Sequence, residues 1–360
     1  MDEVRRLRRQ IDRVDLELVQ LLKGRSQAAR FLGEIKRSRG APLRDPKREN
    51  AIIRKMDRLA RTLDLDKGHV RSIFRQIFGL AVKAQKGTDH RRRSLDNLHV
   101  LVIGGTGGMG RLFAQLARIQ GASVKIAGRN QSRTRKTAKE MGLEHGTISD
   151  AKTSDVVIVA VPVSVTSSIA IQAGRRMKSG SMLADLSSVK TGIADVTARR
   201  IPKQVEYVSL HPLFSPSVNT LSGQNIVAIP FNPGRLWKRL ARALTTEGAR
   251  VRISSVRIHD LAMAHVQVLH HFALMSLGVS LGRWSSVYQT NSLKQTETTI
   301  TSLLKNWSTV MAIQHLNPFG QSARDNLAST VSQLRRIDPR SERLLRKALT
   351  LHVQKWTRKI

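Results

Sequence analysis

A glycine-rich turn between two apolar strands constrains this chain most. The stretch reads LHVLVIGGTGGMGRLFAQLARIQGASVKIAGRN. The apolar run Val100–Ile103 predicts a buried parallel strand, a helical apolar period follows it, and Val124–Ala127 predicts a second strand. In the turn after the first strand, Gly105, Gly107 and Gly110 have G-x-G-x-x-G spacing. A strand, this turn, a helix and a strand together predict a βαβ unit that binds a dinucleotide.

The chemistry of a pyrophosphate explains why glycines stand in this turn. We expect Gly105 to permit the tight turn, Gly107 to let the backbone approach the phosphates, and Gly110 to let helix and strand pack closely. The N-terminus of the helix offers free N–H groups and the positive end of its dipole. The alternative is a glycine-rich turn in an unrelated α/β protein. The residues expected to line this part of the cofactor are Gly105, Thr106, Gly107, Gly108, Met109, Gly110 and Pro162.

The residues after the second strand indicate which dinucleotide binds. An NAD-preferring site places an acidic residue there to bind the ribose hydroxyls. This chain instead has Gly128, Arg129 and Asn130, with Arg133 one helical turn further on. Arginine at this place suits a 2′-phosphate, so we expect NADP as the cofactor, with NAD still possible. The alternative is an ordinary surface arginine in an arginine-rich chain.

Composition narrows the function classes. The 360 residues carry 62 Lys and Arg against 26 Asp and Glu, a formal charge of +36, and no cysteine. Disulfides, thiolate metal sites and cysteine nucleophiles are therefore excluded. The N-terminal residues lack the apolar core of a signal peptide, and the longest apolar run, Val156–Val163, is too short to span a membrane. We expect a cytoplasmic protein whose basic surface attracts anionic small molecules; nucleic-acid binding is the alternative.

The first 87 residues predict three helices. An apolar stripe runs along the first helix to about Lys36, longer than the helix can bury alone, so it needs a partner such as a second copy of itself. Arg25 and Lys36 are about three turns apart and share a face, whereas Arg8 lies roughly 25 Å from Arg25 along the axis. Arg8 therefore cannot reach the same small ligand on its own helix. Asp45 is the expected N-cap of the second helix, and a third runs from about 66 to 85.

These helices resemble the all-helical chorismate mutase domain, in which three helices intertwine as a dimer. The resemblance lies in LRRQIDRVDLELVQLLKGR, GEIKR and RDPKRENAI. It implies a site made of Arg8, Arg25, Lys36, Asp45, Arg48, Glu49 and Gln85, with Arg8 supplied by the partner chain.

The rearrangement of chorismate to prephenate needs no nucleophile or proton transfer. Catalysis comes from fixing a compact conformer and stabilising developing charge. The resemblance implies that Arg8 and Arg25 clamp the two carboxylates, that Lys36 and Gln85 donate to the ether oxygen, and that Glu49 binds the ring hydroxyl.

Further strands are expected at 155–161, 182–185 and 205–210, and the chain turns helical from about residue 257. Ser188 and His211 follow two of these strands, at the sheet edge where α/β proteins bind ligands. The late helix contains His265, His270 and His271, but it lacks the carboxylate of an H-E-x-x-H arrangement, so no metal is expected.

Residues 98–360 resemble prephenate dehydrogenase through GTGGMG, VIVAVPVSVT, ADLSSVK, LHPLFSP and HDLAMAHVQVLHHF. The resemblance implies oxidative decarboxylation of prephenate to 4-hydroxyphenylpyruvate. It assigns the ring hydroxyl to His211, with Ser188 as its hydroxyl partner and His271 as a second active-site histidine. A base near that hydroxyl is what the step needs. The family's carboxylate-binding arginine aligns with Lys294, which can pair with a carboxylate only as a point charge.

The sequence therefore predicts a homodimeric enzyme of tyrosine biosynthesis with three parts. An all-α chorismate mutase domain (1–87) and a linker (88–97) precede an α/β Rossmann-type dinucleotide-binding domain (98–254). An all-α C-terminal domain for substrate binding and dimerisation (255–360) follows. Two alternatives stay open: a dehydrogenase for arogenate or another cyclohexadienyl substrate with a vestigial mutase domain, and a basic nucleic-acid-binding protein.

Overall fold

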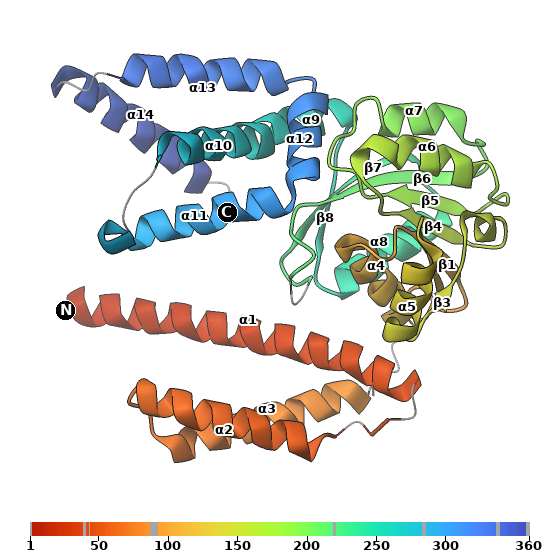
Figure 1. Ribbon diagram of the computed structural model, residues 1–360, viewed down its shortest axis with the longest axis horizontal. Helices are drawn as coiled ribbons and strands as arrows, with labels where there is room; N and C mark the ends of the chain where they lie inside the picture. The colour runs from red at the N-terminus through yellow and green to blue at the C-terminus, as the bar shows by residue number, and fades with distance from the viewer. Residues whose placement is uncertain are drawn as a thin grey trace. The chain divides into compact units, whose positions relative to one another are not determined.

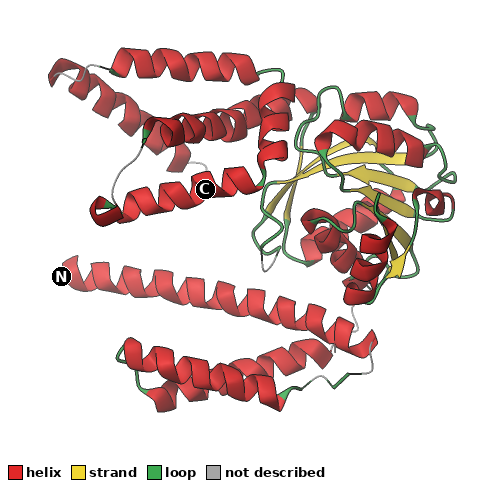
Figure 2. Ribbon diagram, in the orientation of Figure 1, coloured by secondary structure: helices red, strands yellow, loops and turns green. Residues whose placement is uncertain are grey.

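The computed structural model describes residues 2–38, 41–42, 44–86, 93–218, 221–282, 286–335 and 339–357 (Figures 1 and 2). The chain divides into two compact units. Unit 1 comprises residues 1–188 and 192–255, and unit 2 comprises residues 189–191 and 256–360. The sequence predicts separate domains for the N-terminal helices and the dinucleotide-binding sheet. Unit 1 contains both of them, so the predicted boundary between these two domains stays a prediction.

Unit 1 begins with the three expected helices, α1 (Asp2–Ser38), α2 (Pro46–Thr62) and α3 (Lys67–Lys86). The N-cap prediction is confirmed, since the Asp45 side chain accepts a 3.0 Å hydrogen bond from the backbone N–H of Arg48. Helices α2 and α3 are joined by a bidentate pair in which Arg71 donates to both carboxylate oxygens of Asp57, at 2.8 and 2.9 Å.

The rest of unit 1 is built on one eight-stranded sheet (Figure 2). Its order is β3-β2-β1-β4-β5-β6-β7-β8, and neighbouring strands are parallel except β6 and β7. The order reverses at β1, which lies between β2 and β4, and such a point is where open α/β sheets bind ligands. The strands are β1 (His99–Ile103), β2 (Ser123–Ala127), β3 (Glu144–His145), β4 (Val156–Val159), β5 (Met182–Asp185), β6 (Glu206–Pro212), β7 (Asn225–Asn232) and β8 (Arg250–Ile253).

Alternating strand residues build a core on each face of the sheet. On one face, Val100, Val102 and Ile126 are buried under helices that include α4 and α8, and on the other Leu101 and Val157 are buried with α6. Figure 1 shows these helices on opposite sides of the sheet. The helices are α4 (Gly108–Ile119), α5 (Gln131–Met141), α6 (Val163–Gly174), α7 (Ala194–Arg200), α8 (Arg235–Thr246) and the 3₁₀ turn η1 (Ile148–Lys152).

Three strands escaped the sequence prediction. β3 is two residues long and shows no pattern. β7 contains Pro230 and begins with Asn225, residues that are depleted in strands, and β8 alternates arginine with apolar residues on an exposed edge. The pairing of β7 with β6 along Tyr207–Pro212 fixes these strands, and that is tertiary information.

Unit 2 is helical, as expected. A π-helical segment, η2 (Ala264–Leu269), interrupts its first long helix, and Gln314 donates from Nε2 to the carbonyl of Val268 within that segment at 2.9 Å. The other elements are α9 (Val256–Met263), α10 (His270–Ser280), η3 (Ser286–Tyr288), α11 (Asn291–Lys305), α12 (Trp307–Leu316), α13 (Gly320–Leu334) and α14 (Pro339–Thr357).

Within the described part of the chain, the helical run Val256–Ser280 is long and apolar enough to cross a membrane by length and composition. The sequence analysis placed the longest apolar run elsewhere and passed over this one. Core helices of soluble proteins pass the same test when they are mostly buried, whereas 17% of the apolar window in this run is buried. This run also carries a buried polar pair, His259 and Asp260, near its start.

Candidate active sites

A groove among α1, α2 and α3 holds most of the predicted mutase residues. Its volume is about 570 Å³. Arg25 and Lys36 reach it from α1, and Glu49 comes from the first turn of α2. The other predicted residues in its lining are Asp45 and Arg48. Five of the seven positions that the family resemblance assigns are therefore in one groove.

Arg25 is fixed before any ligand binds. Its Nη1 donates to the carbonyl of Ile77 at 3.2 Å, and its guanidinium lies 5.5 Å from the ring centre of Phe78. Burial lowers the pKa of Arg25 below its ordinary value, but an arginine stays charged at neutral pH. The groove therefore presents an oriented cation, as the binding of a carboxylate needs.

The sequence analysis missed Arg44, which pairs with Glu49. Arg44 Nη2 lies 3.2 Å from the Glu49 carboxylate, and hydrogen bonding to Glu49 raises the pKa of Arg44. Glu49 is also shared with a second cavity of about 510 Å³ that Arg44 lines. A five-residue separation across a helix start follows no helical spacing rule, so no sequence signal indicated the pair.

Two predicted mutase residues are not seen in the groove. Arg8 lies on α1 and is exposed, away from the groove lining of its own chain, in line with the expected distance along the axis. Gln85 lies on α3, but its side chain is outside the described residues. Large apolar side chains beside Arg8 are exposed as well, including Leu7, Ile11 and Val14.

The dinucleotide turn has the shape that a phosphate needs. Gly104 has a φ of +86° and is the left-handed residue of the turn, a position that the sequence analysis did not single out. A Cβ on Gly105 would lie 2.5 Å from Cβ of Ile126, so the turn needs a glycine there as well. A Cβ on Gly110 would lie 2.2 Å from the Gly104 carbonyl oxygen, so only glycine fits there. Gly107 is the N-cap of α4 with no side-chain cap, and the first turn has no acidic residue. Thr106, Gly108 and Met109 lie in the same turn. Its backbone N–H groups and the helix dipole fit a pyrophosphate.

The end of β2 carries the residues expected near the ribose. Arg129 is exposed directly after the strand. Asn130 is the N-cap of α5, because its side chain accepts a 2.9 Å hydrogen bond from the backbone N–H of Arg133. A Cβ on Gly128 would lie 2.8 Å from Thr134 Oγ1, so a side chain at this position would require Thr134 to shift. Pro162 caps α6 after β4, at the same edge of the sheet.

Ser188 and His211 lie at the carboxyl edge of the sheet, on neighbouring strands. Asp185, the last residue of β5, pairs with Ser209 of β6. Ser188 lies three residues after Asp185, and His211 lies two residues after Ser209, so both follow this pair towards the carboxyl ends of the strands. His211 is only 3% exposed. Beneath them, Tyr207 donates to Asp185 at 2.7 Å; burial, with Asp185 beside it, raises the pKa of Tyr207 well above its ordinary value.

Unit 2 holds the other predicted dehydrogenase residues. His271 lies on α10, and among the described residues its Nδ1 is buried without a hydrogen-bond partner, as is Oε1 of Gln267 one turn earlier. Burial lowers the pKa of His271, so the ring is neutral at pH 7. Lys294 is exposed on α11. No cluster of three His, Cys, Asp or Glu side chains arranged to hold a metal ion occurs among the described residues.

A buried carboxylate in unit 2 fastens the loop that follows Ser188. Asp260 accepts hydrogen bonds from the backbone N–H of Lys190 at 3.1 Å and of Thr191 at 2.8 Å. His259 Nδ1 lies 2.7 Å from the same carboxylate, and both side chains are fully buried. The sequence analysis quoted His259 and Asp260 only as part of a motif and did not assign them this contact.

Two families match successive parts of the chain. Residues 7–86 match the family described as chorismate mutase type II, and residues 113–253 match prephenate dehydrogenase, nucleotide-binding domain. The second match begins inside α4, after the glycine-rich turn.

Similar proteins cover different shares of the chain. A probable arogenate/prephenate dehydrogenase of Methanocaldococcus jannaschii is 33% identical over 190 residues, which are 51% of this chain and 43% of that protein, so the chain spans less than half the length of this relative. The T-protein of Enterobacter agglomerans is 28% identical over 280 residues, 78% of this chain and 71% of that protein.

Among solved structures, prephenate dehydrogenase from A. aeolicus in complex with hydroxyphenyl propionate and NAD+ superposes with a TM-score of 0.55. The match covers 73% of this chain and 96% of that one at 19% identity, so it bears on the fold alone. The helices α1 to α3 and most of the dinucleotide-binding sheet therefore each lie in a family match, and over most of its length the chain is similar to T-proteins.

Proposed function

We propose that the chain rearranges chorismate to prephenate and then oxidatively decarboxylates prephenate to 4-hydroxyphenylpyruvate. The observation that carries the proposal is the groove where Arg25, Lys36 and Glu49 meet, in a chain that also has a dinucleotide-binding sheet. A vestigial mutase domain would have no reason to keep these three side chains together.

The mutase groove acts by positioning. Arg25, held by Ile77 and Phe78, binds one carboxylate of chorismate, and Arg8 of a second copy of the chain binds the other. Lys36 and Gln85 donate to the ether oxygen as its bond breaks and negative charge develops there. Glu49, kept in place by Arg44, accepts from the ring hydroxyl. Asp45 and Arg48 complete the wall next to α2.

The dehydrogenase site places a base beside the ring hydroxyl. His211 accepts a hydrogen bond from that hydroxyl, and Ser188 orients it. Hydride leaves the carbinol carbon, the bond to the ring carboxylate breaks, and carbon dioxide departs as the ring becomes aromatic. The hydroxyl proton shared with His211 ends on the phenol oxygen. His271 and Lys294 bind the substrate, and Lys294 pairs with its side-chain carboxylate.

A nicotinamide dinucleotide, when bound at the Gly104–Gly110 turn, supplies the hydride acceptor. The turn fits this group because a Cβ at Gly105 or Gly110 would collide with neighbouring atoms. We propose NADP as the preferred form, on the strength of Arg129 and Arg133. The enzyme is further proposed to be a cytoplasmic homodimer that works without a metal ion. Arogenate is a second candidate substrate, because the M. jannaschii relative is named for both compounds.

The test supplies the purified chain with chorismate and NADP and measures 4-hydroxyphenylpyruvate and NADPH. We expect both products, and we expect His211→Asn to lower dehydrogenase turnover about a hundredfold while prephenate still accumulates from chorismate. The pH profile of the dehydrogenase should also lose the limb that a histidine base gives. Consumption of arogenate in preference to prephenate would contradict the assigned substrate, and no turnover of chorismate would contradict the mutase assignment.

A further inference from the structure

Helix α1 has a second face that lies outside the mutase groove. Arg30 is five residues after Arg25, which places it about 140° around the helix, and it does not line the groove. Gln27 and Phe31 of α1 also contact this part of unit 1. This face of α1 meets residues of the dinucleotide-binding domain within unit 1.

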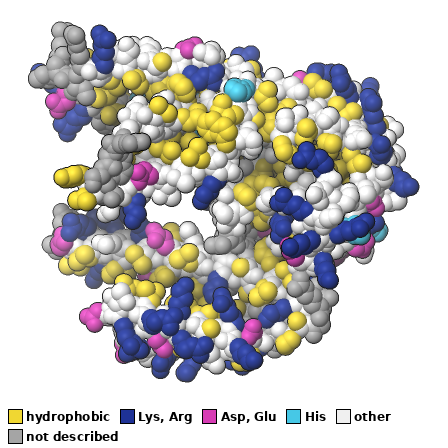
Figure 3. Space-filling view, viewed as in Figure 1, with side chains coloured by type: hydrophobic (Ala, Val, Ile, Leu, Met, Phe, Trp, Pro, Cys, Tyr) yellow, Lys and Arg dark blue, Asp and Glu magenta, His cyan; other side chains and the backbone are white. Residues whose placement is uncertain are grey.

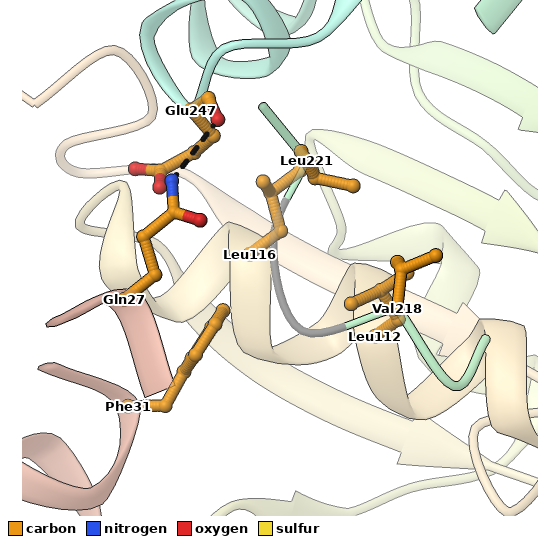
Figure 4. A pocket seen from close by; sticks show the side chains of 7 residues that line it. All are labelled: Gln27, Phe31, Leu112, Leu116, Val218, Leu221 and Glu247. Atoms are coloured by element: carbon orange, nitrogen blue, oxygen red, sulfur yellow. Dashed lines mark hydrogen bonds between the residues drawn. The ribbon is translucent and has the colours of Figure 1, made fainter. Parts of the chain in front are cut away.

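Glu247 is the centre of that contact. It caps the C-terminus of α8, and its side chain is 4% exposed. Its carboxylate pairs with Arg30 and accepts from Nε2 of Gln120 at 2.8 Å, and its backbone carbonyl accepts from Nε2 of Gln27 at 3.2 Å. In Figure 4 the side chain of Gln27 points from α1 toward Glu247.

Helix α4 runs along the same contact. Leu112 and Leu116 of α4, Phe31 of α1 and Glu247 line a small cavity of about 20 Å³ (Figure 4). The N-cap of α4 is Gly107 in the dinucleotide turn, and Gln120, which donates to Glu247, is its C-cap. One end of α4 therefore faces the cofactor site, and the other end reaches the carboxylate that pairs with α1.

The pair joins α1 to a buried carboxylate. A buried carboxylate is stable only when it is paired and hydrogen-bonded, and losing one partner leaves an uncompensated buried charge. Among the described residues, Nε of Arg30 and Oε1 of Gln27 are buried without a partner. The contacts with Glu247 are thus the hydrogen bonds that hold these two side chains in place.

Resting on the proposed mutase activity, we propose that the Arg30–Glu247 pair holds α1 against α4 and so positions Arg25 and Lys36 for the mutase reaction. Glu247 is then a positioning residue of the mutase that the dinucleotide-binding domain supplies. It touches no substrate, and it acts by setting where the groove face of α1 lies relative to α2 and α3.

The experiment compares variants of the full chain. We expect Glu247→Gln to lower kcat for chorismate roughly tenfold, because a misplacement of about 1 Å can cost a hundredfold. Dehydrogenase turnover of supplied prephenate should stay within about twofold, which shows that the dinucleotide domain is folded. Arg30→Gln should match Glu247→Gln, whereas Arg30→Lys, which keeps the charge pair, should retain most of the mutase rate.

A matched control distinguishes the effect of losing the Arg30–Glu247 pair from the effect of losing any carboxylate. Asp195→Asn breaks the exposed Asp195–Arg199 pair, 3.3 Å long, in the same domain and should leave the mutase unchanged. The double variant Arg30→Gln/Glu247→Gln should be no worse than either single variant, since both remove one interaction.

Two results overturn the proposal: a Glu247→Gln chain whose mutase kcat equals that of the wild type, or losses that multiply in the double variant. A wild-type chain without mutase activity would instead overturn the proposed function, and this inference with it.

Discussion

At the scale of single residues, the two proposed sites use cations of different kinds, one held by its neighbours and one exposed. Arg25 is held by a backbone carbonyl and an aromatic ring, so little conformational entropy is lost when a carboxylate binds. Arg129 differs, because it is exposed at the end of β2 with its side chain toward solvent. The contribution of Arg129 to cofactor binding therefore depends on the charge of the ligand rather than on a preformed contact.

Arg129 should decide the preference between the two dinucleotides. A charge-assisted hydrogen bond to a 2′-phosphate is worth about 1.5 to 3 kcal/mol, so we expect a tenfold to hundredfold preference for NADP. Arg129→Ala should remove most of it. The measurement is the ratio of kcat/KM for NADP over NAD at moderate salt, which screens the general attraction of a +36 chain for any anion. A wild-type ratio below one, or a ratio that Arg129→Ala leaves unmoved, would reject the assignment.

Helical spacing explains which site residues the sequence could predict. Arg25 and Lys36 share a face because they are three turns apart on one helix, and the groove contains both. The pairs Arg44–Glu49 and Tyr207–Asp185 were missed. One spans a helix start and the other joins two strands, so neither follows a local period.

At the scale of elements, the features that local residues determine were again predictable, whereas those that depend on distant contacts were not. The start of α2 was predictable from Asp45 and Pro46, because an N-cap and a proline at the first turn act locally. The π-helical turn η2 was not predictable, because the carbonyl of Val268 in this turn accepts its hydrogen bond from Gln314 of α12, which is distant in the sequence. β7 likewise depends on its pairing with β6 rather than on its own residues.

Asp260 should make unit 2 sensitive to acid. Burial alone would raise the pKa of Asp260, but hydrogen bonds from His259 and Thr191 outweigh burial, and its pKa lies below the ordinary 3.8. A carboxyl whose pKa is lower in the folded state adds stability above its unfolded pKa and loses it as pH falls through the folded value. Asp260→Asn should therefore lower the free energy of unfolding by about 2 kcal/mol at pH 7, from charge-assisted hydrogen bonds.

The measurement is the urea midpoint of wild type and Asp260→Asn at pH 7 and at about pH 3. The difference between the two proteins should shrink at the lower pH, because the unfolded carboxyl takes up a proton below its ordinary pKa of 3.8 while the folded carboxyl resists it. Asp195→Asn, at an exposed ion pair, is the matched control and should change either midpoint little. A difference as large at pH 3 as at pH 7 would contradict a role for the charge.

At the scale of the whole molecule, two features go beyond any one site. Lys and Arg side chains are scattered over the face drawn in Figure 3 rather than gathered in one patch. The second feature is α1, which carries Leu7, Ile11 and Val14 at about half exposure or more. An apolar stripe of this length on a charged helix needs a cover, and we propose that a second α1 supplies one.

Complementation tests whether that second copy completes the mutase site. Arg8 lies roughly 25 Å along α1 from Arg25, so each proposed site combines Arg8 of one chain with Arg25 and Lys36 of the other. Arg8→Ala and Lys36→Ala should each be nearly inactive as mutases. When the two are co-expressed, random pairing makes half of the dimers mixed, and each mixed dimer has one intact site. The expected activity is therefore about a quarter of the wild-type value.

Arg25→Ala co-expressed with Lys36→Ala is the control. Both residues come from the same chain, so no mixed dimer has an intact site and activity should not return. No recovery with Arg8→Ala would show that Arg8 does not act across a dimer. Recovery in the control would show that Arg25 and Lys36 of one site come from different chains.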